Sequence, residues 1–254
     1  MATYKKRGYK PKSKKEREQI EELESTTAEV FNTLDESASR TEEWVAKNQR
    51  YILIGIGVVA LAVLGFLGYK EYILKPTEVE ATNEMYQAQQ YFEQALTAGN
   101  ADSLFTLALE GGEGKYGFLD IIDKYSGTKA ANLANYAAGM SYLNMNKYEE
   151  AISHLSDFSS DDPILGAQAK GGLGDAFSQL GQNKEALEYY EKALSHSSND
   201  FTTPKYLMKA AMIALEDNDK EKALQFFNRI KDEFPNTDEG RNVDIFIGRA
   251  LSTN

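Results

Sequence analysis

The side chains that could act as nucleophiles, general bases or metal ligands are few in this chain. It contains no cysteine, which excludes disulfides, thiol nucleophiles and cysteine metal sites. The two histidines, His154 and His196, are too few for a zinc cluster, and neither has a serine or aspartate partner that the sequence reveals. We therefore expect no catalytic, cofactor-binding or metal-binding residue, and a binding protein rather than an enzyme.

A glycine-rich stretch, Gly111-Gly-Glu-Gly114, raises the question of phosphate binding. Such a turn cradles phosphate when a strand precedes it and a Lys-Ser/Thr pair follows it. Here the neighbouring segments, up to residue 109 and over residues 115–125, have helical patterns, and no such pair follows. We interpret the stretch as a loop between helices.

The charge of the chain is unevenly distributed. Residues 78–254 hold 15 basic and 28 acidic side chains, a net charge of −13, which excludes nucleic-acid binding because the charge that neutralises phosphates is missing. Residues 1–15 are basic by contrast. They either contact anionic membrane lipid, at about 1 kcal/mol per basic residue near the surface, or only fix the orientation of the chain.

Residues 51–69 form an uninterrupted apolar stretch of 19 residues without a charge, an amide side chain or a proline. As a helix it would span about 28 Å, close to the roughly 30 Å apolar core of a bilayer. Tyr51 and Tyr69 close its two ends, where interfacial aromatic residues are typical. The stretch predicts a transmembrane helix.

The basic residues predict the orientation of this helix. Eleven Lys and Arg side chains precede it within residues 1–50, whereas Lys70 and Lys75 alone follow it closely. The positive-inside rule then keeps the N-terminus in the cytoplasm and places the C-terminal part on the other side. We expect a single-pass protein whose large domain lies outside the cytoplasm.

The segments around the span have weaker patterns. Within the cytoplasmic region 1–50, a thin apolar stripe from Ile20 to Trp44 indicates a coiled coil, a helix on a membrane or partner, or a solvated linker helix. Residues 70–77 are expected to be a linker that Pro76 interrupts, with Thr77 as the N-cap of a helix over residues 78–98.

The chain repeats itself from residue 130 onward, with a period of 35 to 37 residues. Each copy has two helical segments with a small residue at the point where the two helices would approach most closely. The small residues are Gly139, Gly174 and Ala211 in the first segments, and Ala151, Ala186 and Ala223 in the second. Pro163 and Pro235 separate copies, since proline does not continue a helix.

This pattern resembles the tetratricopeptide repeat, a pair of antiparallel helices of about 34 residues. The resemblance is clearest over residues 130–236 and implies an all-α fold: a single N-terminal transmembrane helix followed by a tetratricopeptide-repeat α-solenoid over residues 78–254. Thr237 is expected to cap a last helix over residues 238–252. The large aromatic residue of the family's first helix is absent, and Asn135, Lys170 and Leu207 stand in its place.

In the tetratricopeptide family the first helices line a concave groove, so the resemblance implies a binding groove for a partner or client at the matching positions. These positions are Leu133, Tyr136, Met140, Leu143 and Asn144, then Gln168, Gly171, Asp175, Ser178 and Gln179, then Lys205, Met208, Met212, Leu215 and Glu216. The flexible thioether of methionine suits the binding of varied apolar segments. The alternative is that these side chains pack against the helices of residues 78–125 or against the last helix.

The combination of one N-terminal anchor with an acidic, exported repeat domain resembles the YfgM-type ancillary subunit of the bacterial Sec translocon, over the span and everything after it. The cytoplasmic region 1–50 is longer than the tail of that family. The resemblance implies a bacterial inner-membrane protein with a periplasmic repeat domain beside SecYEG. It also implies a membrane-anchored periplasmic prolyl isomerase or chaperone as partner, and unfolded exported polypeptides as clients.

The alternative function is a structural adaptor in envelope assembly that binds one folded partner. Outer-membrane biogenesis, cell division or a specialised secretion system would be its setting. An adaptor is expected to bind its partner stoichiometrically and to ignore unfolded chains, whereas a scaffold or chaperone at the translocon binds many different unfolded segments.

Overall fold

The computed structural model describes residues 13–14, 44–98 and 101–252 of the chain. It divides into two units, residues 1–69 and residues 70–254, and each is described by itself. The basic tail over residues 1–15, apart from residues 13–14, lies outside the described residues, and so does the apolar stripe from Ile20 up to, but not including, Trp44.

The described part of the first unit is helical over residues 44–69. The helical residues Trp44–Thr97 include an 18-residue window with a mean hydropathy of 2.5, none of which is buried. By length and composition this window could cross a membrane. A signal sequence meets the same two criteria, so membrane insertion stays a prediction.

The second unit begins with helical structure where the sequence predicted a linker. A π-helix, η1 (Lys70–Leu74), leads directly into the first α-helix, and the Thr77 hydroxyl donates a hydrogen bond of 2.8 Å to the carbonyl of Ile73. The prediction of Thr77 as an N-cap was therefore wrong. Pro76 is tolerated because it lies in the first turn of the α-helix, where the N–H that proline lacks is not needed for an α-helical hydrogen bond.

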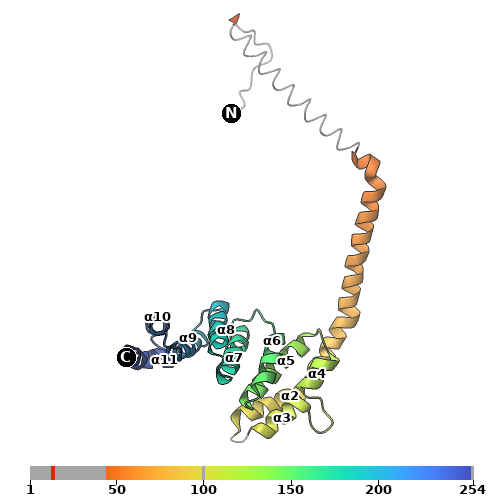
Figure 1. Cartoon of the computed structure of the whole chain (residues 1–254). Coiled ribbons are helices and arrows are strands. Elements are labelled where there is room, and N and C mark those ends of the chain that lie inside the picture. Colours follow the sequence, from red (N-terminus) through yellow and green to blue (C-terminus); the bar gives the residue numbers. More distant parts are fainter. Residues whose placement is uncertain (1–12, 15–43, 99–100, 253–254) are drawn as a thin grey trace. The chain divides into compact units, whose positions relative to one another are not determined.

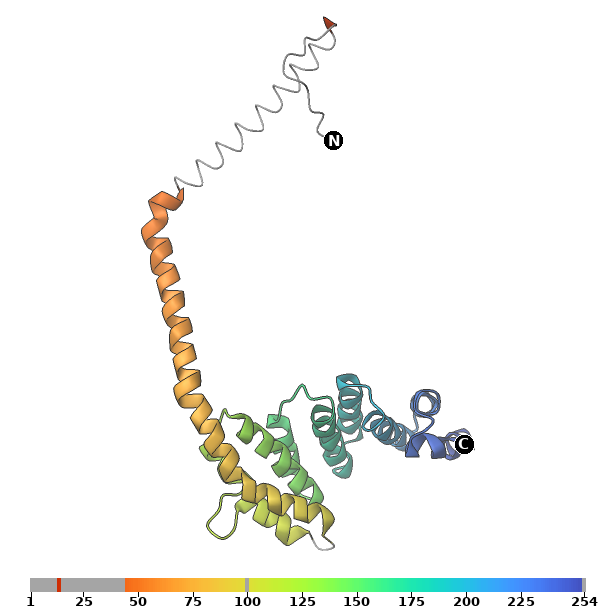
Figure 2. The same cartoon turned by 180° about the vertical axis from the view of Figure 1, so that it is seen from behind.

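The second unit consists of helices that follow one another side by side (Figures 1 and 2). Their bounds are α2 (Lys75–Thr97), α3 (Asp102–Glu110), α4 (Phe118–Lys124), α5 (Lys129–Asn144), α6 (Tyr148–Asp157), α7 (Leu165–Gln179), α8 (Asn183–His196), α9 (Thr203–Glu216), α10 (Lys220–Glu233) and α11 (Asp238–Ser252). Within the described residues there is no strand, only an isolated bridge between Gly112 and Lys115 in the α3–α4 connection. The predicted all-α class and the loop at Gly111–Gly114 are confirmed.

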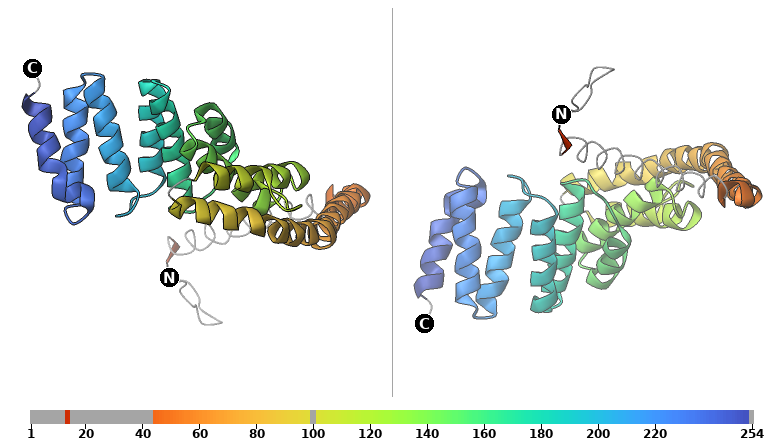
Figure 3. Two further views of the ribbon diagram at one scale, coloured as in Figure 1. Left: turned by 90° about the horizontal axis from the view of Figure 1, so that it is seen from below. Right: turned by 90° about the horizontal axis from the view of Figure 1, so that it is seen from above.

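The repeats predicted from the sequence are the helix pairs α5–α6, α7–α8 and α9–α10, which Figure 3 shows as successive pairs in one row. A Cβ atom added to Gly139 would lie 2.5 Å from Cγ of Leu155 on the paired helix, and one added to Gly174 would lie 2.6 Å from the Tyr190 ring. The small residues therefore mark the closest approach of the paired helices, as predicted. Ala151, Ala186, Ala211 and Ala223 are all fully buried.

The turn inside each pair has the same backbone conformation. Its φ angle is positive at Asn146 (59°), Gly181 (71°) and Asn218 (61°), one residue per repeat at the repeat spacing. Glycine and asparagine are the residues that adopt this left-handed conformation at the lowest cost. The residue types thus permit the same tight turn three times.

The apolar core lies in three clusters along the row of helices. One joins α2, α3, α4 and α5, and a second joins α8, α9, α10 and α11. Between them a small cluster of Leu155, Ala169 and Leu173 joins α6 to α7. Helix α7 is rich in glycine, and this lets bulky side chains of neighbouring helices lie directly on its backbone. The ring of Tyr206, for example, would lie 2.0 Å from a Cβ atom on Gly171.

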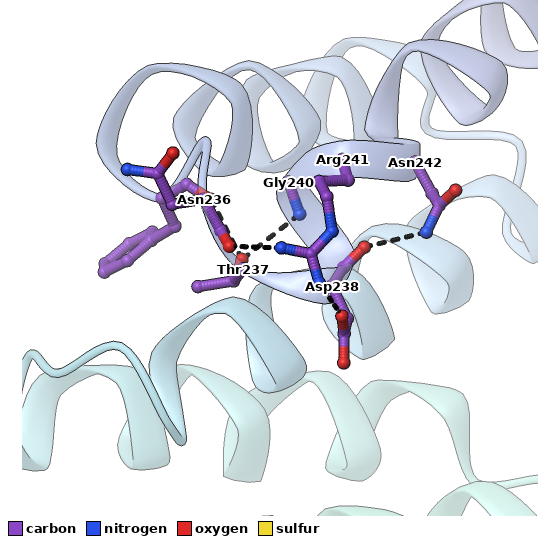
Figure 4. A network of polar contacts seen from close by, with 7 residues as sticks. Asn236, Thr237, Asp238, Gly240, Arg241 and Asn242 are labelled. Atoms are coloured by element: carbon purple, nitrogen blue, oxygen red, sulfur yellow. Dashed lines mark hydrogen bonds and ion pairs between the residues drawn. The ribbon is translucent and has the colours of Figure 1, made fainter.

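The last helix begins with a polar cap (Figure 4). The Thr237 hydroxyl accepts a hydrogen bond of 3.2 Å from the backbone N–H of Gly240, which confirms Thr237 as the cap of α11. The guanidinium of Arg241 adds an ion pair with Asp238 and a hydrogen bond of 2.6 Å to the Asn236 carbonyl. These contacts fix the start of α11, whose Val243 and Ala250 are buried against the preceding repeat.

Candidate functional site

A pocket of about 470 Å³ opens across the middle of the repeat row, and we call it the central pocket. Five helices and one turn supply its lining: Leu143 from α5, Asn146 from the α5–α6 turn, Tyr148 from α6, Asp175, Ser178 and Gln179 from α7, Tyr190 from α8, and Lys209 from α9. Because the lining comes from three successive repeats, the pocket exists only when they are stacked.

A charged pair with a tyrosine forms one side of the pocket. The Lys209 ammonium makes an ion pair with Oδ1 of Asp175, and the Tyr190 hydroxyl donates a hydrogen bond of 2.8 Å to the same oxygen. The side chains of Lys209 and Asp175 are 34% and 23% exposed, so the pair is accessible from the pocket. Burial, and then the negative charge of Asp175, raise the pKa of Tyr190, which keeps its hydroxyl protonated as a donor.

The position of Tyr190 depends on the glycines of α7. Its ring lies over Gly174, where any larger residue would displace it, and it stacks on Tyr206 with ring centroids 6.1 Å apart. Tyr206 in turn lies over Gly171. The two glycines thus let two tyrosines from the neighbouring helices approach α7 and hold the hydroxyl of Tyr190 next to Asp175.

The opposite side of the pocket is formed by amides and a hydroxyl. The Tyr148 hydroxyl donates a hydrogen bond of 2.8 Å to Oδ1 of Asn146 and lies 3.4 Å from Oε1 of Gln179. Asn146 holds its position because it is the left-handed residue of the α5–α6 turn. The contact between Tyr148 and Gln179 joins α6 of the first repeat to α7 of the second.

Of the predicted groove residues, Leu143, Asp175, Ser178 and Gln179 line the central pocket. Tyr136 and Gln168 bond to each other instead, with the Tyr136 hydroxyl 2.9 Å from Oε1 of Gln168. Burial raises the pKa of Tyr136 to about 12. This bond ties α5 to α7 and holds the first two repeats together.

The methionines predicted for apolar binding pack against the core. Met140 contacts the α6–α7 cluster, with its sulfur 3.4 Å from where a Cβ of Gly172 would lie, and Met208 and Met212 pack on the C-terminal cluster. Leu215 packs there as well, and Leu133 packs on the N-terminal cluster. Asn144, Lys205 and Glu216 are exposed and lie outside the pocket lining. The apolar residues of the predicted groove thus have different surroundings: Leu133 packs with the helices of residues 78–125, Met140 packs on the α6–α7 cluster, and Leu143 lines the pocket.

Four lining residues were not predicted from the sequence: Asn146, Tyr148, Tyr190 and Lys209. A signal for Lys209 was present, since it follows Asp175 by 34 residues and has the opposite charge. Two residues one repeat apart occupy equivalent positions on stacked helices, so such a pair predicts an ion pair between repeats. Tyr190 gave no comparable signal, because it lies on a second helix.

The two histidines lie outside the central pocket. His154 stacks on Tyr142 at 5.4 Å, and its Nδ1 lies 3.0 Å from Oδ1 of Asn135. Burial lowers the pKa of His154. Nε2 of His196 lies 3.0 Å from the carbonyl of Asp162, one repeat earlier. Within the part of the chain that the structure describes, no group of three or more His, Asp or Glu residues could hold a metal ion.

Comparison with known proteins gives a family and two similar solved structures. The family model described as "T7SS, ESX-1 secretion system protein EccA1, N-terminal domain" matches residues 79–243. The structure titled "MamA MSR-1 C2" is 17% identical and covers 66% of this chain and 97% of its own, with a TM-score of 0.39. The structure titled "MamA AMB-1 P212121" is also 17% identical and covers 68% and 99%, with a TM-score of 0.36. A comparison with curated proteins gives no match.

Proposed function

The chain belongs to the family of the N-terminal domain of the ESX-1 type VII secretion system protein EccA1, and from this premise we propose that it is a scaffold that binds other polypeptides through its repeat helices. The observation that carries the proposal is the central pocket, whose lining comes from three stacked repeats. Stacked helical repeats serve as extended binding surfaces, and a pocket with converging polar groups is the usual form of a binding site. The proposal is a binding function without catalysis.

The proposed location is the bacterial inner membrane, with the N-terminus in the cytoplasm and the repeat domain in the periplasm. The apolar residues 51–69 and the excess of basic residues before them support this location. Alkaline phosphatase fused after residue 254 should be active in cells, and a fluorescent protein that matures only in the cytoplasm should be dark at the same position. The opposite pattern would reverse the topology.

Within this location we place the scaffold at the Sec translocon. There it would contact SecYEG and a membrane-anchored periplasmic prolyl isomerase or chaperone, and its clients would be unfolded exported polypeptides. The resemblance of the chain's organisation to the YfgM-type ancillary subunit supports this assignment. The open pocket in the repeat domain supports a site for such clients.

The second candidate is an adaptor in a specialised secretion system that binds one folded partner. The observation that favours it is the family match, whose description names a secretion system protein. An adaptor would recognise a fixed surface on its partner, and its binding would be stoichiometric and saturable with that partner alone.

One experiment separates the two candidates. The tagged full-length protein is purified from its native membrane in mild detergent, and mass spectrometry identifies the proteins that accompany it. Recovery of SecY, SecE and SecG with a periplasmic isomerase supports the translocon. Recovery of a secretion machine without these proteins supports the adaptor. A Gln179→Ala variant tests whether the pocket is used, with Lys205→Met outside the pocket as a control, and client recovery should fall only in the first.

A further inference from the structure

We propose that the central pocket recognises the main chain of an extended polypeptide segment, not its apolar side chains, so that clients bind with little sequence preference. This inference rests on the proposed function as a polypeptide-binding scaffold and names the chemistry of that same site. Recognition of the main chain takes the place of the binding of apolar client segments by methionines, which the sequence predicted.

The first observation is that the methionines predicted for the groove are in contact with the protein core and are absent from the pocket lining. Met140, Met208 and Met212 are half-buried against the core clusters, and Leu143 is the one aliphatic residue of the pocket lining. Binding of an apolar side chain gains free energy in proportion to the apolar area that leaves water. The lining has one aliphatic residue, and its seven other residues all have polar groups, so polar contacts are available to a ligand along the whole lining.

The second observation is that the lining retains hydrogen-bonding capacity. Both contacts to Asp175, from Lys209 and Tyr190, go to Oδ1, and Oδ2 accepts no hydrogen bond from the described residues. The Lys209 ammonium has three donors, of which the ion pair uses one. The amide nitrogens of Asn146 and Gln179 donate to no residue in the described ranges.

These groups match the needs of a polypeptide backbone. Each peptide unit presents one N–H donor and one C=O acceptor, and in an extended segment both are unpaired. Oδ2 of Asp175 can accept from the N–H, while Lys209, Gln179 and Asn146 can donate to the C=O. Asn146 and Gln179 are exposed, and Asp175 and Lys209 are partly exposed. An apolar side chain bound in the same place would displace water from these groups, at a cost of about 1–3 kcal/mol for each group that it buries without a partner.

The third observation is the arrangement of the donors and acceptors along the repeats. Asn146 belongs to the first pair, Asp175 and Gln179 to the second, and Lys209 to the third. Packed helices lie about 8–10 Å apart, and an extended chain advances about 3.3 Å per residue. A segment of about three residues therefore passes from one helix to the next, so a short extended segment can contact all three repeats.

The test uses the full-length protein in detergent and fluorescently labelled peptides of about ten residues, which exceeds the roughly six residues that two steps between repeats require. One peptide is rich in serine and threonine, and a second has the same length but is rich in leucine and methionine. A third repeats the first sequence with N-methyl groups on alternate peptide nitrogens, which removes N–H donors without changing side chains. Fluorescence anisotropy gives the three affinities.

We expect the first two peptides to bind with affinities within about threefold of each other, and N-methylation to weaken binding by about tenfold or more. The variants Lys209→Met and Gln179→Ala should each weaken binding of the unmethylated peptides by about fivefold to tenfold. Lys205→Met removes the same charge from the same helix outside the pocket and should leave binding unchanged. Thermal unfolding of each variant establishes that the repeats remain folded.

Two kinds of negative result are distinguishable. If the wild-type protein binds none of the peptides and no reduced, carboxymethylated protein, the proposed scaffold function fails, and the inference fails with it. If the wild-type protein binds but the N-methylated peptide binds equally well, the main-chain inference fails and the scaffold function stands. The main-chain inference also fails if the peptide rich in leucine and methionine binds more than about tenfold tighter than the peptide rich in serine and threonine. It fails as well if Lys205→Met weakens binding as much as Lys209→Met.

Discussion

The carboxylate of Glu78, in the first turn of α2, accepts a hydrogen bond of 2.7 Å from the backbone N–H of Lys129, 51 residues later in the chain. Its second oxygen accepts the next N–H of α5, from Ala130, at 2.9 Å. The first N–H groups of a helix have no partner inside it, and the helix dipole favours a negative charge there. Helix α2 thus adds two acceptors to the N-terminus of the first repeat, next to the N-cap Thr128, whose hydroxyl accepts the following N–H, from Ala131, at 3.0 Å.

Replacing Glu78 with alanine removes both acceptors from the start of α5. We expect the repeat domain to lose about 1–2 kcal/mol of unfolding free energy, the range for removal of a capping acceptor. Thermal unfolding of the full-length protein in detergent, followed by tyrosine fluorescence, measures the loss. Glu93→Ala is the control, because Glu93 is an exposed acid on the same helix. Equal loss in the two variants would contradict the capping role.

Gly171→Ala tests the contact between α7 and the third repeat. The new Cβ atom would lie 2.0 Å from the ring of Tyr206, which is 2% exposed and stacks on Tyr190, so the ring must shift. We expect a loss of about 1–3 kcal/mol from overpacking. Gly248→Ala is the matched control: this glycine of α11 has no atom within 4 Å of the new Cβ, and the change should stabilise by up to about 1 kcal/mol. Denaturant unfolding compares the two, and stabilisation by both would refute the close contact.

The ion pair between Asp175 and Lys209 joins the second and third repeats, but both side chains are partly exposed. We expect a double-mutant cycle with Asp175→Asn and Lys209→Met to give a coupling energy below about 1 kcal/mol, as for other solvent-accessible pairs. The pair would then serve ligand binding more than stability. A coupling well above this value, measured by urea unfolding, would assign it a structural role instead.

We expect the stability of the repeat domain to depend on pH through His154. Burial lowers its pKa below 6.5, although the nearby charge of Asp157 opposes the shift. The unfolded chain therefore takes up a proton first as the pH falls, and the stability that the neutral imidazole contributes is lost below about pH 6.5. Between about pH 7.5 and about pH 5, the Tm of the wild-type protein should fall more than that of His154→Gln, which cannot be protonated. Parallel pH profiles would contradict this.

The sequence predicted the repeat region well because its signals are local and recur. Gly139 and Gly174 mark the close approach of paired helices, and Thr237 caps α11, as predicted. The linker prediction failed at Pro76 because proline alone does not reveal that a π-helical turn precedes it. Proline is tolerated in a first helical turn, so the helix continues where the sequence indicated a break.

The binding site was predicted less well than the fold. The positions of Asp175 and Gln179 followed from the repeat register, whereas Tyr190 and Tyr148 reach the pocket from second helices that the family pattern does not assign to the groove. The methionines were assigned to binding by residue type, but Met140 faces the small α6–α7 cluster. Half-buried methionines suit both a groove and a core, and residue type cannot distinguish the two.

By itself, the sequence determined the apolar stretch over residues 51–69, the acidic character of the repeat domain and the period of its repeats. These properties depend on composition and on spacing along one helix or between equivalent helices. Only the tertiary structure decided which side chains meet across the repeats, such as Glu78 with Lys129 and Tyr190 with Asp175. Those contacts depend on how the helices stack and on which glycines of α7 let a neighbour approach, and no spacing along a single helix contains that information.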